Sequence, residues 1–115
     1  MRHISILLIV LLILPALSYA QMESEGYTVT ENQMNFASSL TQLANVNIAK
    51  WKSPVDLWVE GIFENKPKEA QKQQAGEIAD RVLLMAQNEG LDQSFCVNVH
   101  NGNYIPLATK CWEAP

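Results

Sequence analysis

The first twenty residues have the organisation of an export signal. Arg2 gives a positive start, an apolar run extends from Ile4 to Leu14, and Ser18-Tyr19-Ala20 places small residues where a signal peptidase cleaves. The run is shorter than the about 20 apolar residues of a membrane-spanning helix. An uncleaved N-terminal anchor is the alternative. We expect residues 1–20 to be a signal peptide cleaved after Ala20, which makes the protein periplasmic or secreted without stable membrane insertion after cleavage.

Cleavage would leave one small acidic domain. It removes 20 of the 115 residues and, because Arg2 is lost, changes the net charge from −4 to −5. A chain of this size buries a core that is only marginally sufficient for stability. Its basic residues are scattered, unlike the clustered Lys and Arg of nucleic-acid binders, so we expect no nucleic-acid partner. We expect a flexible leader over 21–29 and a single domain over 30–115.

Cys96 and Cys111 are the only cysteines in the chain. In an oxidising compartment, an even pair in a small domain favours a disulfide. His100 would share a strand face with Cys96, which leaves two alternatives: a Cys-His-Cys metal site, or a nucleophilic cysteine with His100 as its base. The spacing lacks the paired short intervals of strong metal motifs. We therefore favour the disulfide and expect no metal site and no cofactor.

The cysteines bracket a predicted hairpin. Residues 94–100 alternate in hydrophobicity, Asn101-Gly102 is a strong turn signal, and residues 104–112 have the pattern of a returning strand. A two-residue Asn101-Gly102 loop would not place the two cysteines opposite each other. Their pairing therefore needs a longer loop or a bulge near Asn103.

Two helices and one further strand complete the predicted domain. Two pairs, Thr28 with Glu31 and Thr30 with Gln33, have capping-box spacing at the start of a helix over 30–45, after which the pattern becomes ambiguous. Residues 55–63 alternate as a strand, with Leu57, Val59 and Gly61 on one face. A helix follows from Pro67 to about Glu89. The order α-β-α-β-β predicts an α+β two-layer sandwich, with two helices on a small mixed three-stranded sheet and a C-terminal disulfide-stapled hairpin.

The middle of the chain resembles a known strand–helix unit. Residues 57–61, Leu-Trp-Val-Glu-Gly, precede a polar turn and helical Ala70, Ala75, Ile78, Ala79 and Val82. This arrangement resembles the strand–helix core of exported BON domains and, more loosely, the opening of peptidoglycan-binding OmpA-type domains. The sequence departs from the OmpA type, because it has no convincing helix Asp-plus-Arg pair for holding a peptidoglycan acid. The resemblance covers about a third of the chain and implies no functional residues.

The sequence contains no recognisable catalytic motif. It has no Gly-rich phosphate loop, no GxSxG and no HExxH. His100 is expected to be a solvent-facing strand residue. Asp56 and Glu60 share a strand face, where a solvated acidic stripe is favoured over a carboxylate pair for acid–base chemistry. We therefore favour a non-enzymatic protein and identify no catalytic residues.

Aromatic side chains offer the better functional signal. Trp58 projects to the acidic face of its strand and Tyr104 follows the turn, so both could stack on a sugar or grip a protein. Burial of Trp58 beneath the N-terminal helix is the competing interpretation, and we favour it, because a small domain can rarely leave three tryptophans outside.

These signals suggest an exported non-enzymatic binding module that engages a protein or an envelope polymer. Two alternatives are an inhibitor or immunity-type protein acting through the 100–104 hairpin tip, and a small exported hydrolase. The candidate binding residues are Trp58, Asp56, Glu60, His100, Asn101 and Tyr104.

Overall fold

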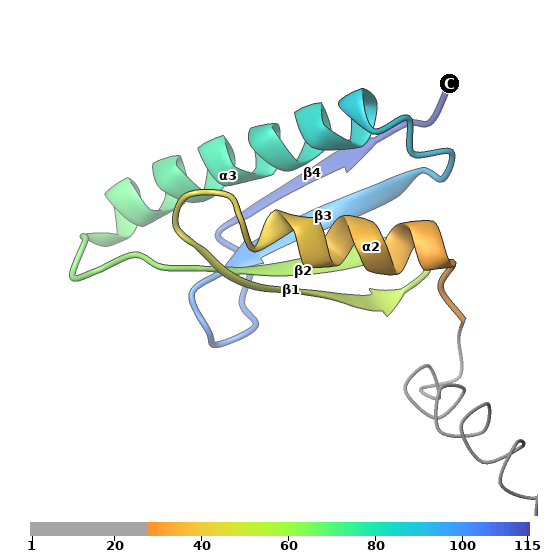
Figure 1. The fold of residues 1–115 in the computed structure, drawn as a ribbon. Coiled ribbons are helices and arrows are strands. Elements are labelled where there is room, and N and C mark those ends of the chain that lie inside the picture. Colours follow the sequence, from red (N-terminus) through yellow and green to blue (C-terminus); the bar gives the residue numbers. More distant parts are fainter. Residues whose placement is uncertain (1–27) are drawn as a thin grey trace, which may run out of the picture.

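The computed structural model describes residues 28–115, which form two layers. Along the chain, the elements are α2 (Glu31–Leu40), β1 (Val46–Ser53), β2 (Asp56–Gly61), α3 (Lys68–Asn88), β3 (Phe95–His100) and β4 (Ala108–Trp112). The strands form one sheet in the order β1-β2-β3-β4, in which β2 and β3 are parallel and both outer pairs are antiparallel. Both helices lie on the same side of this sheet (Figure 1).

The α+β class is confirmed, but the prediction of a three-stranded sheet is wrong. The missing strand is β1, in the segment that had been ambiguous. The helix expected over 30–45 ends at Leu40, and Asn45 adopts a positive φ of 65° before the chain turns into the sheet. The register of β1 shifts twice, between Val46 and Ile48 and between Trp51 and Ser53. Such irregularities disrupt the two-residue alternation by which a strand is recognised in sequence.

The signal peptide and most of the expected leader lie outside the described residues. Of the leader, Thr28 and Val29 are described, and the Val29 side chain is buried in the core.

The parallel pair β2 and β3 carries the centre of the core. Leu57 and Val59 on β2, with their partners Val97 and Val99 on β3, are completely buried. Helix α3 covers them with Ala75, Ile78, Ala79 and Val82. The strands predicted over 55–63 and 94–100 are thus present as β2 and β3, and Leu57, Val59 and Gly61, expected on one strand face, are all buried.

Helix α2 is fixed to the β1–β2 end of the sheet by one glutamine. The predicted capping box is present: the Gln33 amide donates to Thr30 Oγ1, and the Thr30 amide donates to Gln33 Oε1. Gln33 Nε2 then donates to the carbonyl of Pro54 at 2.8 Å. The indole N–H of Trp51 donates to the Gln33 carbonyl at 2.7 Å. The tryptophan that α2 covers is therefore Trp51 on β1.

The disulfide between Cys96 and Cys111 is present and joins directly opposed residues of β3 and β4. The expected longer loop is confirmed, because the strands are joined by residues 101–107, here called the β3–β4 loop. The returning strand is shorter than expected and starts at Ala108. Pro106 lies in the loop, where its missing N–H costs no ladder hydrogen bond.

Removing the disulfide should measure its contribution to this small fold. The two cysteines are 15 residues apart, and closing such a loop stabilises the folded state by about 3 kcal/mol in the chain-entropy model. The Cys96→Ala/Cys111→Ala protein should lose about that free energy of unfolding in urea titrations. An unchanged urea midpoint would show that the four-stranded sheet holds the hairpin without the covalent link.

Candidate functional site

The face of the sheet opposite the helices, here called the open face, carries most of the predicted binding residues. Register places Lys50, Trp58, Asn98 and Thr109 in one row across the four strands. Glu60 and His100 lie opposite each other in the next row along β2 and β3. Most of the β3–β4 loop lies on this side of the sheet (Figure 1).

Three rings meet on the open face and form what we call the aromatic cluster: Trp58, His100 and Tyr104. Tyr104 stacks on His100, with ring centroids 4.3 Å apart and an interplanar angle of 26°. Trp58 contacts both, with centroids 5.7 Å from each. The strands supply Trp58 and His100, and the loop brings Tyr104 back over them.

A lysine from β1 completes this arrangement. Lys52 Nζ lies 3.9 Å from the centre of the Tyr104 ring and 5.2 Å from that of Trp58. An ammonium group over aromatic faces is attracted by their negative charge density. The cluster therefore presents aromatic surface and positive charge together. Lys52 was not predicted as a site residue, because β1 was not recognised as a strand of the sheet.

His100 is buried, so its expected exposure to solvent is wrong: 1 % of its surface is accessible. Its Nδ1 accepts two hydrogen bonds, from the amide of Gly102 at 3.0 Å and from the amide of Tyr104 at 3.2 Å. An acceptor Nδ1 places the proton of the neutral ring on Nε2. Burial lowers the pKa of His100 below 6.5, Glu60 opposes this shift by raising it, and Lys52 adds to the lowering.

The loop backbone takes conformations that side chains disfavour. Gly102 has φ 108° and Tyr104 has φ 58°. Glycine accepts positive φ freely, but a bulky aromatic residue does so only when its surroundings hold it there. At Tyr104 the surroundings are the His100 ring beneath the phenol and the His100 acceptor at the amide.

Trp58 is not covered by the N-terminal helix, and the expectation of its burial there is wrong. It lies on the open face, where it is partly buried by the two other rings of the cluster. The helix covers Trp51 instead. Only Trp58 was expected under the helix, because β1, the strand that does lie under α2, was the segment that the sequence left ambiguous.

The remaining predicted binding residues lie around the cluster at different distances from it. Glu60 lies beside His100, accepts a hydrogen bond from Asn47 Nδ2 at 2.7 Å, and has its Oε1 3.7 Å from the place that a Cβ on Gly102 would take. Asn101 points to the helix layer, where its Nδ2 donates to Gln71 Oε1. Asp56 lies at the other end of β2 and accepts from Ser53 Oγ in the β1–β2 turn. The structure therefore brings together Trp58, Glu60, His100 and Tyr104, and separates Asp56 and Asn101 from them.

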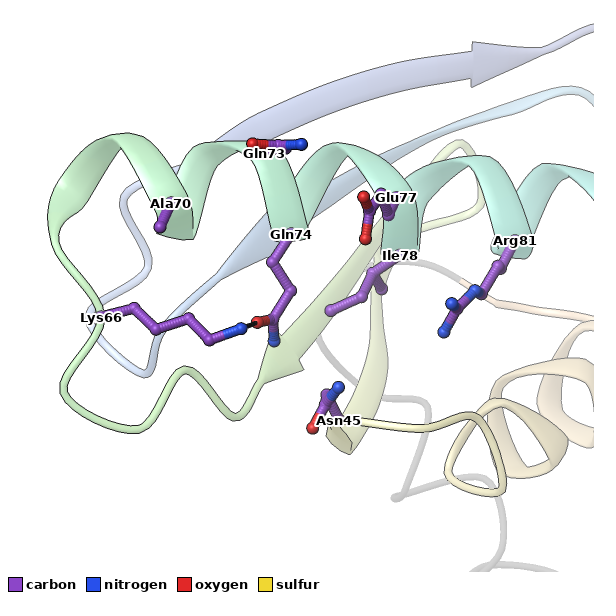
Figure 2. Close-up of a pocket in the computed structure, with 8 residues that line it drawn as sticks. All are labelled: Asn45, Lys66, Ala70, Gln73, Gln74, Glu77, Ile78 and Arg81. Carbon is purple, nitrogen blue, oxygen red and sulfur yellow. Dashed lines mark hydrogen bonds between the residues drawn. The ribbon is translucent and has the colours of Figure 1, made fainter.

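A polar cavity of about 280 Å³ lies beside α3, on the helix side (Figure 2). Gln74 is its buried polar group, and its amide is satisfied within the chain: Lys66 Nζ donates to Oε1, and Nε2 donates to the Ile62 carbonyl at 2.8 Å. These bonds tie the β2–α3 turn to the helix. They give Gln74 a structural role. The cavity is lined by Asn45, Lys66, Ala70, Gln73, Gln74, Glu77, Ile78 and Arg81.

The Cys-His-Cys metal site and the nucleophilic cysteine both required free thiols, and Cys96 and Cys111 are instead joined in the disulfide. Between residues 28 and 115, no three His, Cys, Asp or Glu side chains are grouped so that they could hold a metal ion. The Nδ1 lone pair of His100, which a general base would use, is engaged by two backbone amides.

Two glycine substitutions, one in the β3–β4 loop and one in α3, should change the free energy of unfolding in opposite directions. Gly102→Ala forces a side chain into φ 108° and should lower the free energy of unfolding by about 1–2 kcal/mol. Gly76→Ala is the control, because Gly76 lies inside α3 with no atom within 4 Å of an added Cβ. It should raise stability by roughly 0.5–1 kcal/mol. Urea unfolding measures both, and a neutral Gly102→Ala would contradict the loop conformation described above.

Comparison with known proteins identifies no relative of this chain. No protein-family model matches it, and neither the curated proteins nor the solved structures contain a significant match. The resemblance of residues 57–82 to exported strand–helix units therefore gains no support from these comparisons.

Proposed function

We propose that this protein is an exported, non-enzymatic binding module that engages a protein or an envelope polymer through the aromatic cluster. The observation that carries this proposal is the gathering of Trp58, Tyr104 and Lys52 on the face opposite both helices. Such a surface suits recognition, because Trp and Tyr combine apolar rings with a polar edge and dominate the energy of many interfaces. Tyr104 keeps 42 % of its surface accessible in this position.

Export rests on the signal-like segment 1–20, with cleavage after Ala20 into the periplasm or the extracellular space. The disulfide is compatible with that location, since such bonds persist in oxidising compartments. None of the helices within residues 28–115 has the length and apolar character needed to span a bilayer.

An inhibitor or immunity-type function through the hairpin tip is the second candidate. Ile105, 64 % exposed, is the observation that favours it, because an apolar loop residue can plug a partner's cleft. The loop folds back over the sheet and stacks Tyr104 on His100, which supports a role for the whole face over a protruding tip. The hydrolase alternative lacks such support, because the His100 lone pair is occupied.

Binding should depend on the cluster and not on the helix layer. Trp58→Ala and Tyr104→Ala should each weaken binding to a partner recovered from the native compartment by at least about 2 kcal/mol, as expected for interface hot spots. Leu84→Ala is the matched control, because Leu84 is an exposed apolar residue of α3, 55 % accessible. Calorimetry against the partner, identified by affinity capture and mass spectrometry or by sedimentation with envelope polymer, gives the affinities.

The same measurements distinguish the two candidate functions. Retained affinity in both cluster variants would reject the cluster as the binding surface. Loss of affinity in Ile105→Ser alone would assign binding to the loop tip. Circular dichroism of each variant confirms that the fold is intact, which matters most for the partly buried Trp58.

A further inference from the structure

Two backbone amides of the β3–β4 loop share one titratable acceptor on the open face. The amides of Gly102 and Tyr104 both donate to His100 Nδ1. A protonated imidazole carries N–H groups at both nitrogens and has no acceptor left. Protonation of His100 would therefore remove both hydrogen bonds and turn an N–H toward two backbone N–H groups.

Backbone strain favours release once those bonds are lost. Tyr104 has φ 58°, a conformation that a bulky residue keeps only when several contacts impose it. His100 supplies both the acceptor of the Tyr104 amide and the ring stacked on its phenol, while Trp58 and Lys52 contact the same phenol. The two ends of the loop are held elsewhere, by the bond from Asn101 Nδ2 to Gln71 and by the bond from the Leu107 amide to the Val99 carbonyl. Loss of the bonds to His100 would therefore free the strained segment between those ends. The neighbouring bond from the Ile105 amide to Asn103 Oδ1 is local to the loop and would not anchor it to the sheet.

We propose that His100 is a pH-sensitive latch: the neutral ring holds the β3–β4 loop on the open face, and protonation releases the loop and takes the aromatic cluster apart. The consequence for binding rests on the proposed function, because a partner that needs Tyr104 over Trp58 would be bound at neutral pH and released in acid. The latch itself is a property of the isolated protein.

The charged groups around His100 influence the pH at which the latch opens. Glu60 faces it from β2 and favours the protonated ring, whereas Lys52 faces it from β1 and favours the neutral ring; Tyr104 faces it from the loop as an uncharged phenol. Burial dominates and lowers the pKa of the closed state below 6.5. The stability that the closed loop contributes is therefore present above pH 6.5 and is lost as the pH falls through the lowered pKa.

Nuclear magnetic resonance of the oxidised protein between pH 7.5 and 4 tests the latch without any partner. The His100 imidazole carbons report its titration, and the exchange rates of the Gly102 and Tyr104 amides with solvent, corrected for intrinsic pH dependence, report the loop. As the pH falls from 6.5 to the lowered pKa of His100, the ratio of open to closed loop should rise about tenfold per pH unit, because opening takes up one proton. Amides of β2 should not change.

Two variants sharpen the test. In His100→Asn, a side-chain oxygen can take the place of Nδ1 as acceptor but does not titrate, so the loop should stay closed across this range. In Glu60→Gln, loss of the carboxylate charge should move the transition to lower pH. The proposal is overturned if His100 titrates in the wild type while the Gly102 and Tyr104 amides stay unchanged, or if His100→Asn opens at the same pH as the wild type.

Failure of the latch and failure of the proposed function are separate outcomes. An intact pH transition combined with unaltered partner binding in Trp58→Ala and Tyr104→Ala would keep the latch and reject the cluster as a binding surface. Gly102 and Tyr104 amides that stay protected across the pH range, combined with weakened partner binding in Trp58→Ala and Tyr104→Ala, would keep the binding surface and reject the latch.

Discussion

The parallel pairing of β2 with β3 determines what each face of this protein can do. Because the paired residues point alternately up and down, one register places Leu57, Val59, Val97 and Val99 under the helices and sends Trp58 and His100 to the other side. A slip of one residue would exchange the two sets and put an imidazole and an indole into the core. Core stability and the aromatic cluster are therefore fixed by the same ladder of hydrogen bonds.

Much of this ladder can be predicted from sequence, because its signals are local. The alternation in residues 55–63 and 94–100, the Pro67-to-Glu89 helix and the pairing of Cys96 with Cys111 depend on short-range patterns, and all are present. The α2 capping box is equally local. In contrast, β1 contains two register shifts and follows a helix that ends earlier than its apolar pattern suggests, so the strand has no clean period of two.

The missing strand explains why the site was predicted only in part. Without β1, the N-terminal helix had no strand of its own to cover, and Trp58 was assigned to it in place of Trp51. Lys52 could not be placed at all. His100 was predicted to be exposed because no hydrophobicity pattern indicates a loop that folds back over its own strand. The group that buries it, Tyr104, does so with a positive φ, which cannot be predicted from its residue type.

The aromatic residues thus fall into two groups, one in the core beneath α2 and one on the open face. Trp51 and Phe95 pack edge-to-face within the core, 5.4 Å apart, whereas Trp58 and Tyr104 remain partly accessible around a histidine. The first pair is tied to α2 through the Gln33 carbonyl, and the second depends on a loop. Because the middle of that loop is bonded to the sheet through His100, the proposed binding surface can change without disturbing the sheet.

The most direct test of this account is the protonation state of the His100 ring at neutral pH. In protein labelled with ¹⁵N at histidine, the two imidazole nitrogens have chemical shifts that distinguish the tautomers. The account predicts a neutral ring that carries its proton on Nε2, with Nδ1 as the acceptor of the Gly102 and Tyr104 amides. A ring protonated on Nδ1, or one that averages between tautomers as in free histidine, would contradict it.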